Sequence, residues 1–218
     1  MFDLHTHSLL SDGELIPSEL VRRAVVHGYE AVAITDHVDF TNVEHILKCL
    51  QKSELQANPN SEIEVIRGVE ITHVPPEKIG ALVKKATDLG AELVVVHGET
   101  IAEPVESGTN RAAVSNPAVN ILAHPGLITE EEAERAKENG IYLEISSRKG
   151  HSLTNGHVAQ VARNVGASVV LNSDLHSPDD FLTEEFGARI LAGTGLDPDE
   201  VRKAMDVNPR KLLKELGR

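Results

Sequence analysis

Seven short apolar runs in this chain each lead into a histidine, aspartate or glutamate, and amphipathic stretches separate one run from the next. The residues that follow the runs are, in chain order, His5 and His7, Asp36 and His37, Glu70, His97, His124, Glu144, and Asp174 and His176. Apolar runs that alternate with helical stretches are typical of parallel strands joined by crossover helices. Polar residues at the C-terminal end of each strand are typical of the active face of a β/α barrel. We therefore predict an α/β fold, a distorted (β/α)7 TIM-like barrel that forms a single domain over residues 1–218.

The amphipathic stretches predict the helices of this barrel. Apolar residues recur at helical spacing, with capping residues, prolines and glycines near the ends, at 17–27, 42–57, 77–89, 129–140 and 156–165. Ser177, Asp197 and Asn208 each precede a proline and are predicted to cap further helices. The irregular stretch 98–110 follows a strand end and is predicted to cover the site. A doubly wound open sheet is the competing architecture, but it gathers its site at one switch point and not at every strand end.

Composition limits the classes of partner. The formal net charge is −13, aromatic residues make up 3% and tryptophan is absent, so the chain has neither the basic face nor the stacking platform of general nucleic-acid binders. A small anionic substrate remains compatible, because bound divalent ions reverse the sign of the local field. No apolar run is long enough to span a membrane, and no signal peptide is recognisable. With one cysteine, Cys49, we expect a cytoplasmic protein; the sequence does not predict its oligomeric state.

The residue types at the strand ends are those that bind Zn²⁺, Mn²⁺ or Fe. His5 and His7 are two residues apart, so on a strand both imidazoles face the same side, and Asp174 and His176 repeat that spacing near the other end of the chain. The first and last strands of a barrel are neighbours, so the two pairs are expected to meet. Asp12 lies in a loop that can fold back over the barrel mouth.

The remaining histidines are expected to have ordinary roles. His27, His45, His151 and His157 lie on or beside predicted helices and are interpreted as structural or surface residues. His73 is left out of the site, because a residue three positions after Glu70 on a strand faces the opposite side. By the same argument Asp36, directly before His37, is expected to support the site rather than to bind metal.

Three further residues are candidates for contact with the substrate. Glu144 is expected to contact a metal or its bound water, or to serve a hydrogen-bonding role at the barrel mouth. Arg148 follows a strand end and Arg111 follows the irregular stretch, and both are predicted to bind phosphate, since a guanidinium group binds phosphate through two parallel hydrogen bonds.

Together, these motifs resemble those of the PHP family (polymerase and histidinol phosphatase), in the family's order. The matching segments are His-Thr-His-Ser at 5–8, Ser-Asp-Gly at 11–13, Ile-Thr-Asp-His at 34–37, Gly-Val-Glu at 68–70, Val-His-Gly at 96–98, Ala-His-Pro-Gly at 123–126 and Ser-Asp-Leu-His at 173–176. The resemblance implies a distorted seven-stranded barrel and a trinuclear metal site that acts on phosphate esters. It implies three ligand sets, namely His5, His7, Glu70 and Asp174; a bridging Glu70 with His97 and His124; and Asp12, His37 and His176. Many members have a histidine where Asp12 stands.

The sequence therefore predicts a metal-dependent phosphoesterase. Two to three divalent ions (Zn²⁺, Mn²⁺ or Fe²⁺) are expected to activate water for attack on a small phosphate ester, such as histidinol phosphate or a nucleotide phosphate. The residues predicted to take part in catalysis are Glu70, Asp174, Glu144 and Arg148. No stable binding to nucleic acid or membranes is expected.

Two other classes of function remain open. A C–N hydrolase of the amidohydrolase type is one alternative, although no strand here ends in the bridging lysine that such enzymes usually carry. A non-catalytic accessory or regulatory subunit is the other. It fits less well, because all nine candidate ligand positions hold residues able to bind metal.

Overall fold

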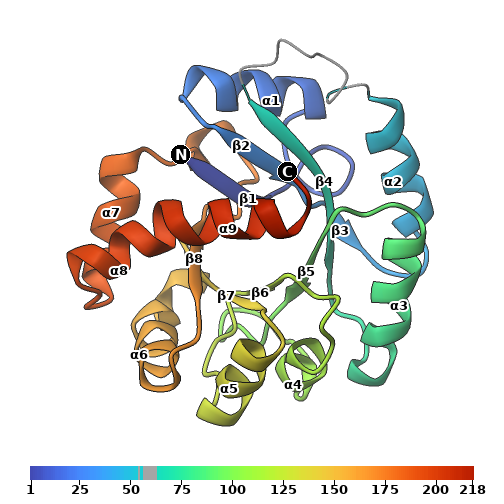
Figure 1. The fold of residues 1–218 in the computed structure, drawn as a ribbon. Coiled ribbons are helices and arrows are strands. Elements are labelled where there is room, and N and C mark those ends of the chain that lie inside the picture. The colour runs from blue at the N-terminus through green and yellow to red at the C-terminus, as the bar shows by residue number, and fades with distance from the viewer. Residues whose placement is uncertain (54, 56–62) are drawn as a thin grey trace.

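The computed structural model describes residues 1–53, 55 and 63–218, and its centre is a parallel β-sheet. The strands are β1 Phe2–Thr6, β2 Ala31–Ile34, β3 His37–Val38, β4 Glu64–Ile71, β5 Leu93–His97, β6 Ile121–Ala123, β7 Tyr142–Ser146 and β8 Val169–Asn172. Seven of them follow one another in the order β1-β2-β4-β5-β6-β7-β8, and the two-residue β3 pairs with β4. Every strand pair is parallel (Figure 1). Each crossover between them therefore lies outside the sheet, as the alternating sequence pattern predicts.

The sheet curls until its first and last strands meet. Thr6 forms a parallel bridge with Leu175, and the His7 amide donates to the Leu175 carbonyl at 2.8 Å. The Asp174 amide donates to the His5 carbonyl at 3.1 Å. These contacts nearly close the barrel, and the predicted single-domain, seven-stranded TIM-like architecture is confirmed. The competing open sheet is excluded, since it would leave both edges unpaired.

Nine helices are found among the described residues. Their bounds are α1 Pro17–Val26, α2 Val43–Lys52, α3 Pro76–Asp88, α4 Thr109–Val114, α5 Glu130–Glu138, α6 Asn155–Val165, α7 Glu184–Gly193, α8 Pro198–Arg202 and α9 Asn208–Glu215. The helices predicted at 17–27, 77–89 and 156–165 agree with α1, α3 and α6 to within a residue or two, and Thr129 caps α5 as expected. Part of the stretch predicted at 42–57 lies outside the described residues.

Two helical regions differ in extent from the sequence expectations. Ser177 is an N-cap as predicted, but it opens only the short 3₁₀ turn Pro178–Asp180, and the longer helix α7 begins after a second cap, Thr183. The irregular stretch predicted at 98–110 ends at Thr109, where helix α4 begins, and the sequence pattern does not predict this helix. This helix has six residues, too few for an apolar repeat to be visible in the sequence.

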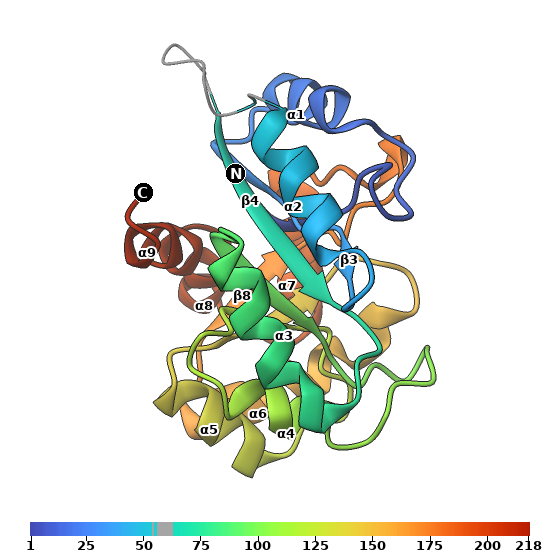
Figure 2. The same cartoon turned by 90° about the vertical axis from the view of Figure 1, so that its right-hand side faces the viewer.

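Apolar side chains pack in two layers, one inside the barrel and one between the strands and the outer helices. The interior layer includes Phe2, Leu4, Ile66, Leu93 and Ile121, together with Leu212 and Leu213 of α9. Figure 2 shows α9 at the end of the barrel where the strands begin, away from β3. Because apolar residues fill that end, only the C-terminal ends of the strands can hold a polar site. No helix in the described ranges is both long and apolar enough to cross a membrane.

An irregularity in β1 sets which of its residues face inward. Asp3 pairs with Val32 but Thr6 pairs with Ile34, so β1 uses one more residue than β2 over the same distance. Such a β-bulge reverses the alternation of side chains beyond it. Leu4 therefore belongs to the interior apolar layer, while His5 contacts Glu144 across the barrel at 2.8 Å.

Candidate metal centre

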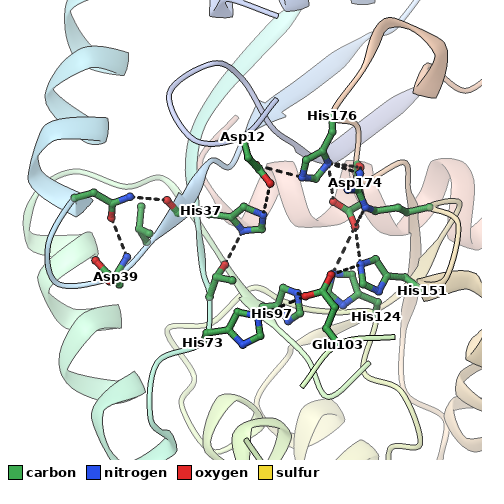
Figure 3. A pocket seen from close by; sticks show the side chains of 14 residues that line it. Asp12, His37, Asp39, His73, His97, Glu103, His124, His151, Asp174 and His176 are labelled. Carbon is green, nitrogen blue, oxygen red and sulfur yellow. Dashed lines mark hydrogen bonds and ion pairs between the residues drawn. The ribbon is translucent and has the colours of Figure 1, made fainter. Parts of the chain in front are cut away.

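A pocket of about 380 Å³ opens at the C-terminal ends of the strands. Histidines and acidic residues at or beyond the C-terminal ends of all seven strands of the β1-β2-β4-β5-β6-β7-β8 order line it (Figure 3). The labelled residues in that view are Asp12, His37, Asp39, His73, His97, Glu103, His124, His151, Asp174 and His176. The chain therefore gathers one polar cluster above an apolar barrel interior.

The first group in the cluster joins the two ends of the chain. His5 Nε2 lies 3.1 Å from His7 Nε2 and 3.3 Å from Glu70 Oε1. His7 Nε2 lies 3.3 Å from Asp174 Oδ1. All four side chains are buried. The structure thus brings together the four residues that the resemblance to the PHP family assigns to one metal.

His124 and His97 form a second group beside the first. His124 Nε2 lies 3.6 Å from Glu70 Oε1 and 3.7 Å from Asp174 Oδ2. The His97 ring centroid is 4.5 Å from that of His124, and His97 Nδ1 lies 3.1 Å from the Gly98 carbonyl oxygen. A carbonyl oxygen only accepts, so the proton of His97 is on Nδ1 and its Nε2 is left as a potential ligand.

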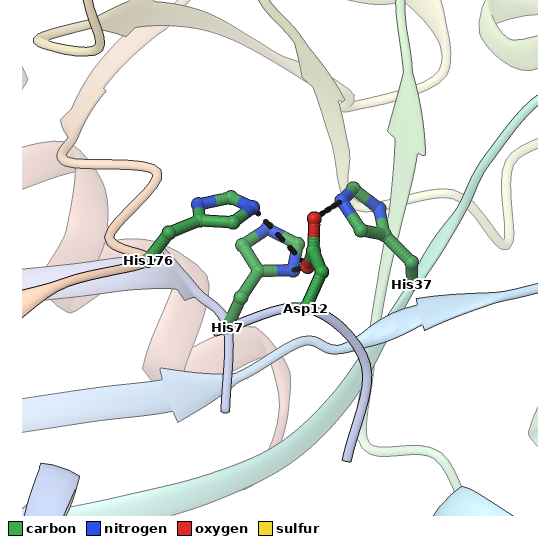
Figure 4. Close-up of side chains that lie close together, drawn as sticks. All are labelled: His7, Asp12, His37 and His176. Atoms are coloured by element: carbon green, nitrogen blue, oxygen red, sulfur yellow. Dashed lines mark ion pairs between the residues drawn. The ribbon is translucent and has the colours of Figure 1, made fainter. Parts of the chain in front are cut away.

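The third group is more exposed and is centred on Asp12. Asp12 Oδ1 lies 3.3 Å from His176 Nε2, and Asp12 Oδ2 lies 3.5 Å from His37 Nε2 (Figure 4). His7 Nδ1 is 3.9 Å from Asp12 Oδ1, so His7 borders this group as well as the first. Two imidazoles thus flank the two oxygens of one carboxylate.

Asp36 holds the loop that carries Asp12. Its carboxylate accepts hydrogen bonds from the Ser8 amide and hydroxyl at 2.8 and 2.7 Å, and from the Ser11 amide and hydroxyl at 3.1 and 2.7 Å. The loop packs so tightly that a Cβ atom on Gly13 would lie 2.3 Å from the His7 carbonyl oxygen. Asp36 thus supports the site without entering it, as its place in the sequence indicated.

Glu144 lies behind His5 and does not line the pocket. Its Oε2 is 2.8 Å from His5 Nδ1 and accepts a hydrogen bond from Asn172 Nδ2 at 2.9 Å. A carboxylate on Nδ1 fixes the ring orientation and leaves Nε2 to face the cluster. Of the two roles expected for Glu144, the structure shows the hydrogen-bonding one, and its carboxylate also lies within a candidate metal group with His5 and His124.

The buried charges in the cluster require a cation. Glu70, Glu144 and Asp174 are buried carboxylates, and Glu70 Oε1 and Asp174 Oδ2 have no hydrogen-bond partner. Burial lowers the pKa of His5, but the surrounding carboxylates, first of all Glu144, raise it well above its ordinary value. Burial also raises the pKa of Glu70, but His5 and His37 hold it well below its ordinary value. Divalent ions would provide the positive charge that protonated imidazoles otherwise supply, so the donor set fits metal binding.

Strained backbone conformations occur at residues that line the same pocket. Among the described residues other than glycine, positive φ angles occur at His73 (51°), His124 (28°) and Asp174 (55°), and all three side chains line the pocket. Such conformations cost roughly 1–3 kcal/mol each and persist where the surrounding structure imposes them. The fold thus stores strain at the candidate site.

Three pocket residues were missed or set aside in the sequence. His151 was interpreted as structural, but its ring stacks on His124 with centroids 4.0 Å apart. His73 was excluded by strand alternation, yet β4 ends at Ile71 and the positive φ of His73 turns its ring to 5.1 Å from that of His97. Glu103 follows no strand directly, so the strand-end pattern does not predict it, and the acidic residues of the 98–110 stretch are the signal that points to it.

The two predicted phosphate ligands lie in different places. Arg148 lines the pocket, with Nε 3.7 Å from Asp174 Oδ2. Arg111 is 65% exposed, pairs with Glu131 at 3.2 Å and borders a different hollow. The structure therefore places Arg148, but not Arg111, where it can meet a substrate in the cluster. The phosphate contact predicted for Arg111 is not retained.

A parallel barrel with imidazoles and carboxylates gathered at its C-terminal mouth defines a β/α-barrel protein suited to binding divalent metal ions. A model described as the PHP domain matches residues 3–98. The uncharacterised protein MJ1295 of Methanocaldococcus jannaschii is 50% identical over 217 residues, which are 99% of each chain. The chain belongs to the PHP family.

Other relatives carry different names. Ribonuclease P protein component 3 of Methanosarcina barkeri is 26% identical over 97% of this chain and 88% of its own. The probable phosphatase YcdX of Escherichia coli is 28% identical over 97% of this chain and 91% of its own. Relatives are thus named both as probable phosphatases and as ribonuclease P protein component 3.

Solved structures show the same fold at low sequence identity. A chain of archaeal ribonuclease P with mature tRNA has a TM-score of 0.74 and 15% identity over 99% of this chain and 91% of its own. Histidinol phosphate phosphatase from Lactococcus lactis, complexed with zinc, L-histidinol and phosphate, has a TM-score of 0.57 and 17% identity over 99% of this chain and 93% of its own. At this identity the likeness establishes the fold alone.

Proposed function

We propose that this protein is a metal-dependent phosphoesterase that hydrolyses a small phosphate ester. The observation that carries the proposal is the buried cluster of Glu70, Asp174 and their facing imidazoles, whose unpartnered oxygens and convergent nitrogens suit divalent ions. Relatives named as probable phosphatases, including YcdX, support hydrolysis of phosphate esters as the reaction. Zn²⁺, Mn²⁺ and Fe²⁺ are the ions that such donors bind.

Three ligand groups would hold the ions. They are His5, His7, Glu70 and Asp174; Glu70 with His97 and His124; and Asp12, His37 and His176. When bound, the ions activate water and neutralise phosphate oxygens. Glu70 and Asp174 lie between the first two groups, where each can face both. Glu144 keeps the His5 ring oriented, and Asp36 keeps Asp12 in reach of the third group.

Arg148 is the residue best placed to bind the substrate phosphate. His176 Nδ1 lies 2.9 Å from the Asp174 carbonyl oxygen and 2.5 Å from Arg148 Nη1. In the tautomer that leaves His176 Nε2 for a metal, Nδ1 carries a proton and donates to that carbonyl, so it cannot also accept from Arg148. Arg148 Nη1 also donates to the Asp174 carbonyl at 3.1 Å, and the guanidinium is 32% exposed at the pocket, so the donors that this bond does not use can reach a phosphate there.

The pocket and the overall charge favour a small substrate. A volume of about 380 Å³ suits a single small molecule rather than a folded polymer. The net charge of −13 disfavours a polyanion, whereas a local cluster of divalent ions still attracts one phosphate group. No lysine is found among the described residues that line the pocket, which disfavours the C–N hydrolase alternative.

The test is phosphate release by Mn²⁺- and Zn²⁺-reconstituted protein from an aryl phosphate, histidinol phosphate, nucleoside bisphosphates and short oligonucleotides. His7→Ala is the matched loss-of-site variant, and His27→Ala, on the outer side of the barrel, is the control. Turnover that depends on added metal and disappears only in His7→Ala supports the proposal. Equal turnover in His7→Ala and wild type would refute it.

A second reading comes from the relatives named ribonuclease P protein component 3, which match over nearly the whole chain. In that reading the barrel serves an RNA–protein assembly and releases no phosphate. Tight, salt-dependent binding of a structured RNA, together with no turnover of any phosphate ester, would favour it. We favour a metal-dependent enzyme over this second reading because all nine candidate ligand positions hold residues that can bind metal.

A further inference from the structure

The loop between β5 and α4 brings a carboxylate over the second ligand group. Glu103 Oε2 lies 3.1 Å from His97 Nε2 and 3.5 Å from His73 Nε2, and its Oε1 lies 3.5 Å from His151 Nε2 (Figure 3). These imidazoles come from the ends of three different strands. Neither Glu103 nor His151 belongs to the nine ligand positions found by motif.

The base of this loop is fixed on both sides. Glu99 Oε1 accepts hydrogen bonds from the Gly108 and Asn110 amides, both at 2.9 Å. Asn110 Oδ1 accepts from the Glu99 amide at 2.9 Å, and Asn110 Nδ2 donates to the Pro125 carbonyl at 2.8 Å. A Cβ atom on Gly126 would lie 1.8 Å from the Glu99 carbonyl oxygen, so the turn after His124 packs directly against the loop. Glu103 is therefore held near His97 by the architecture of the loop.

The facing atoms of His97 and Glu103 are both acceptors. His97 donates from Nδ1 to the Gly98 carbonyl, so its Nε2 presents a lone pair to the Glu103 oxygen. Two acceptors 3.1 Å apart are stable only with a cation between them, either a proton or a metal ion. The donor atoms themselves thus indicate a cation position outside the first ligand group.

His151 is oriented toward the same position. Its Nδ1 lies 2.8 Å from the Thr100 hydroxyl, which fixes the ring and leaves Nε2 to face Glu103 and Asp174. Ligand atoms of His97, His124 and His151 all lie within 4.8 Å of one another, and the same holds for His73, His97 and Glu103. The two groups share His97, so His151 and Glu103 add one nitrogen and one oxygen donor, both suited to Zn²⁺ or a comparable ion, beside the second ligand group of Glu70, His97 and His124.

We propose that His151 and Glu103 are ligands of the second metal ion, in addition to Glu70, His97 and His124. This inference rests on the metal centre of the proposed function. Glu103 is 39% exposed and sits on a loop, so it is the ligand in this group that solvent or a substrate oxygen can displace. The other ligands are buried and remain in place.

The test measures metal binding and does not require activity. The full-length protein, stripped with a chelator, is titrated with Co²⁺ and with Zn²⁺, and the bound ions are counted by elemental analysis. Glu103→Gln and His151→Gln are compared with Glu106→Gln, an exposed residue of the same loop, and with His157→Gln, a partly buried histidine outside the pocket. We expect one ion to bind at least about 10-fold more weakly in the first two variants, with altered Co²⁺ absorption bands. The controls are expected to match wild type.

The outcomes separate this inference from the proposed function. Unchanged affinity and Co²⁺ bands in Glu103→Gln, which is exposed enough to fold normally, would overturn the inference and leave the proposed function standing. Weakened binding in the variants of a protein that releases no phosphate would support the inference and refute the phosphoesterase. A wild-type protein that binds no metal would overturn both.

Discussion

Glu144→Gln isolates the contribution of one buried carboxylate to metal affinity. Glu144 Oε2 contacts His5 Nδ1 at 2.8 Å and Asn172 Nδ2 at 2.9 Å, whereas Oε1 has no partner. A glutamine can place its oxygen at the Oε2 position and keep both contacts, so that the change removes mainly the negative charge. Loss of a carboxylate that supports a ligating imidazole typically weakens metal binding about 10- to 100-fold. This corresponds to about 1.4 to 2.8 kcal/mol.

The assay is competition for Zn²⁺ against a chromophoric chelator, with Glu134→Gln, an exposed residue of α5, as the control. The metal-free variant should also lose stability, because Glu144 pairs with His5 and raises the pKa of that imidazole, and the substitution leaves His5 without its charged partner. Zn²⁺ affinity is therefore compared under conditions in which circular dichroism shows both metal-free proteins to be folded, so that lower affinity reports on the metal site. Unchanged Zn²⁺ affinity in Glu144→Gln would refute the argument that this carboxylate sets the orientation and basicity of His5.

Three further predictions concern stability and the third ligand group. Burial raises the pKa of Asp3 to about 7, so the folded state keeps a proton that the unfolded state releases, and stability falls as pH rises from about 4 to 7. In Asp3→Asn, the decrease in the free energy of unfolding between these pH values should be smaller by up to about 4 kcal/mol. The measurement is urea unfolding in the presence of a chelator. A stability difference between variant and wild type that does not change with pH would contradict this prediction. Ile66→Ala should lower the free energy of unfolding by about 2–5 kcal/mol, because Ile66 is buried in the barrel interior. Leu127→Ala, at an exposed position, should lower it by under about 0.5 kcal/mol. Equal losses in chemical unfolding would contradict the packing described. Asp36→Ala should release the Asp12 loop and lower the count of tightly bound ions by one, and an unchanged count would show that Asp36 is dispensable.

The fold could be predicted because each strand carries its own evidence. Apolar runs at regular intervals define the barrel, and the side chains that face inward change from apolar to polar along each strand. On β4, Ile66 lies in the interior apolar layer, and Glu70, four residues later, contacts the histidine cluster. This change is local in the sequence, so eight of the nine ligand positions are visible without a structure; the ninth, Asp12, lies in a loop and was assigned from the resemblance to the family's motifs.

The rest of the pocket depends on geometry that the sequence does not display. His73 enters through a positive φ angle just past the end of β4, where the alternation rule for strands no longer applies. His151 begins a short 3₁₀ turn, and Glu103 is brought back to the strand ends by hydrogen bonds between Glu99 and Asn110. For Arg111 the error runs the other way. Its place after the 98–110 stretch predicts a position in the pocket, but Arg111 lies on α4 and its side chain is on the outer surface.

Anomalous X-ray diffraction from crystals grown with Mn²⁺ or Zn²⁺ tests the central claim, that the barrel mouth is a metal centre, most directly. The account predicts strong peaks within the pocket, one beside each of the three ligand groups, with Glu103 and His151 bordering the peak nearest His97. These peaks should disappear from the first group in His7→Ala crystals. A map with no peak among these side chains, from protein shown to be folded and saturated with metal, would contradict the account.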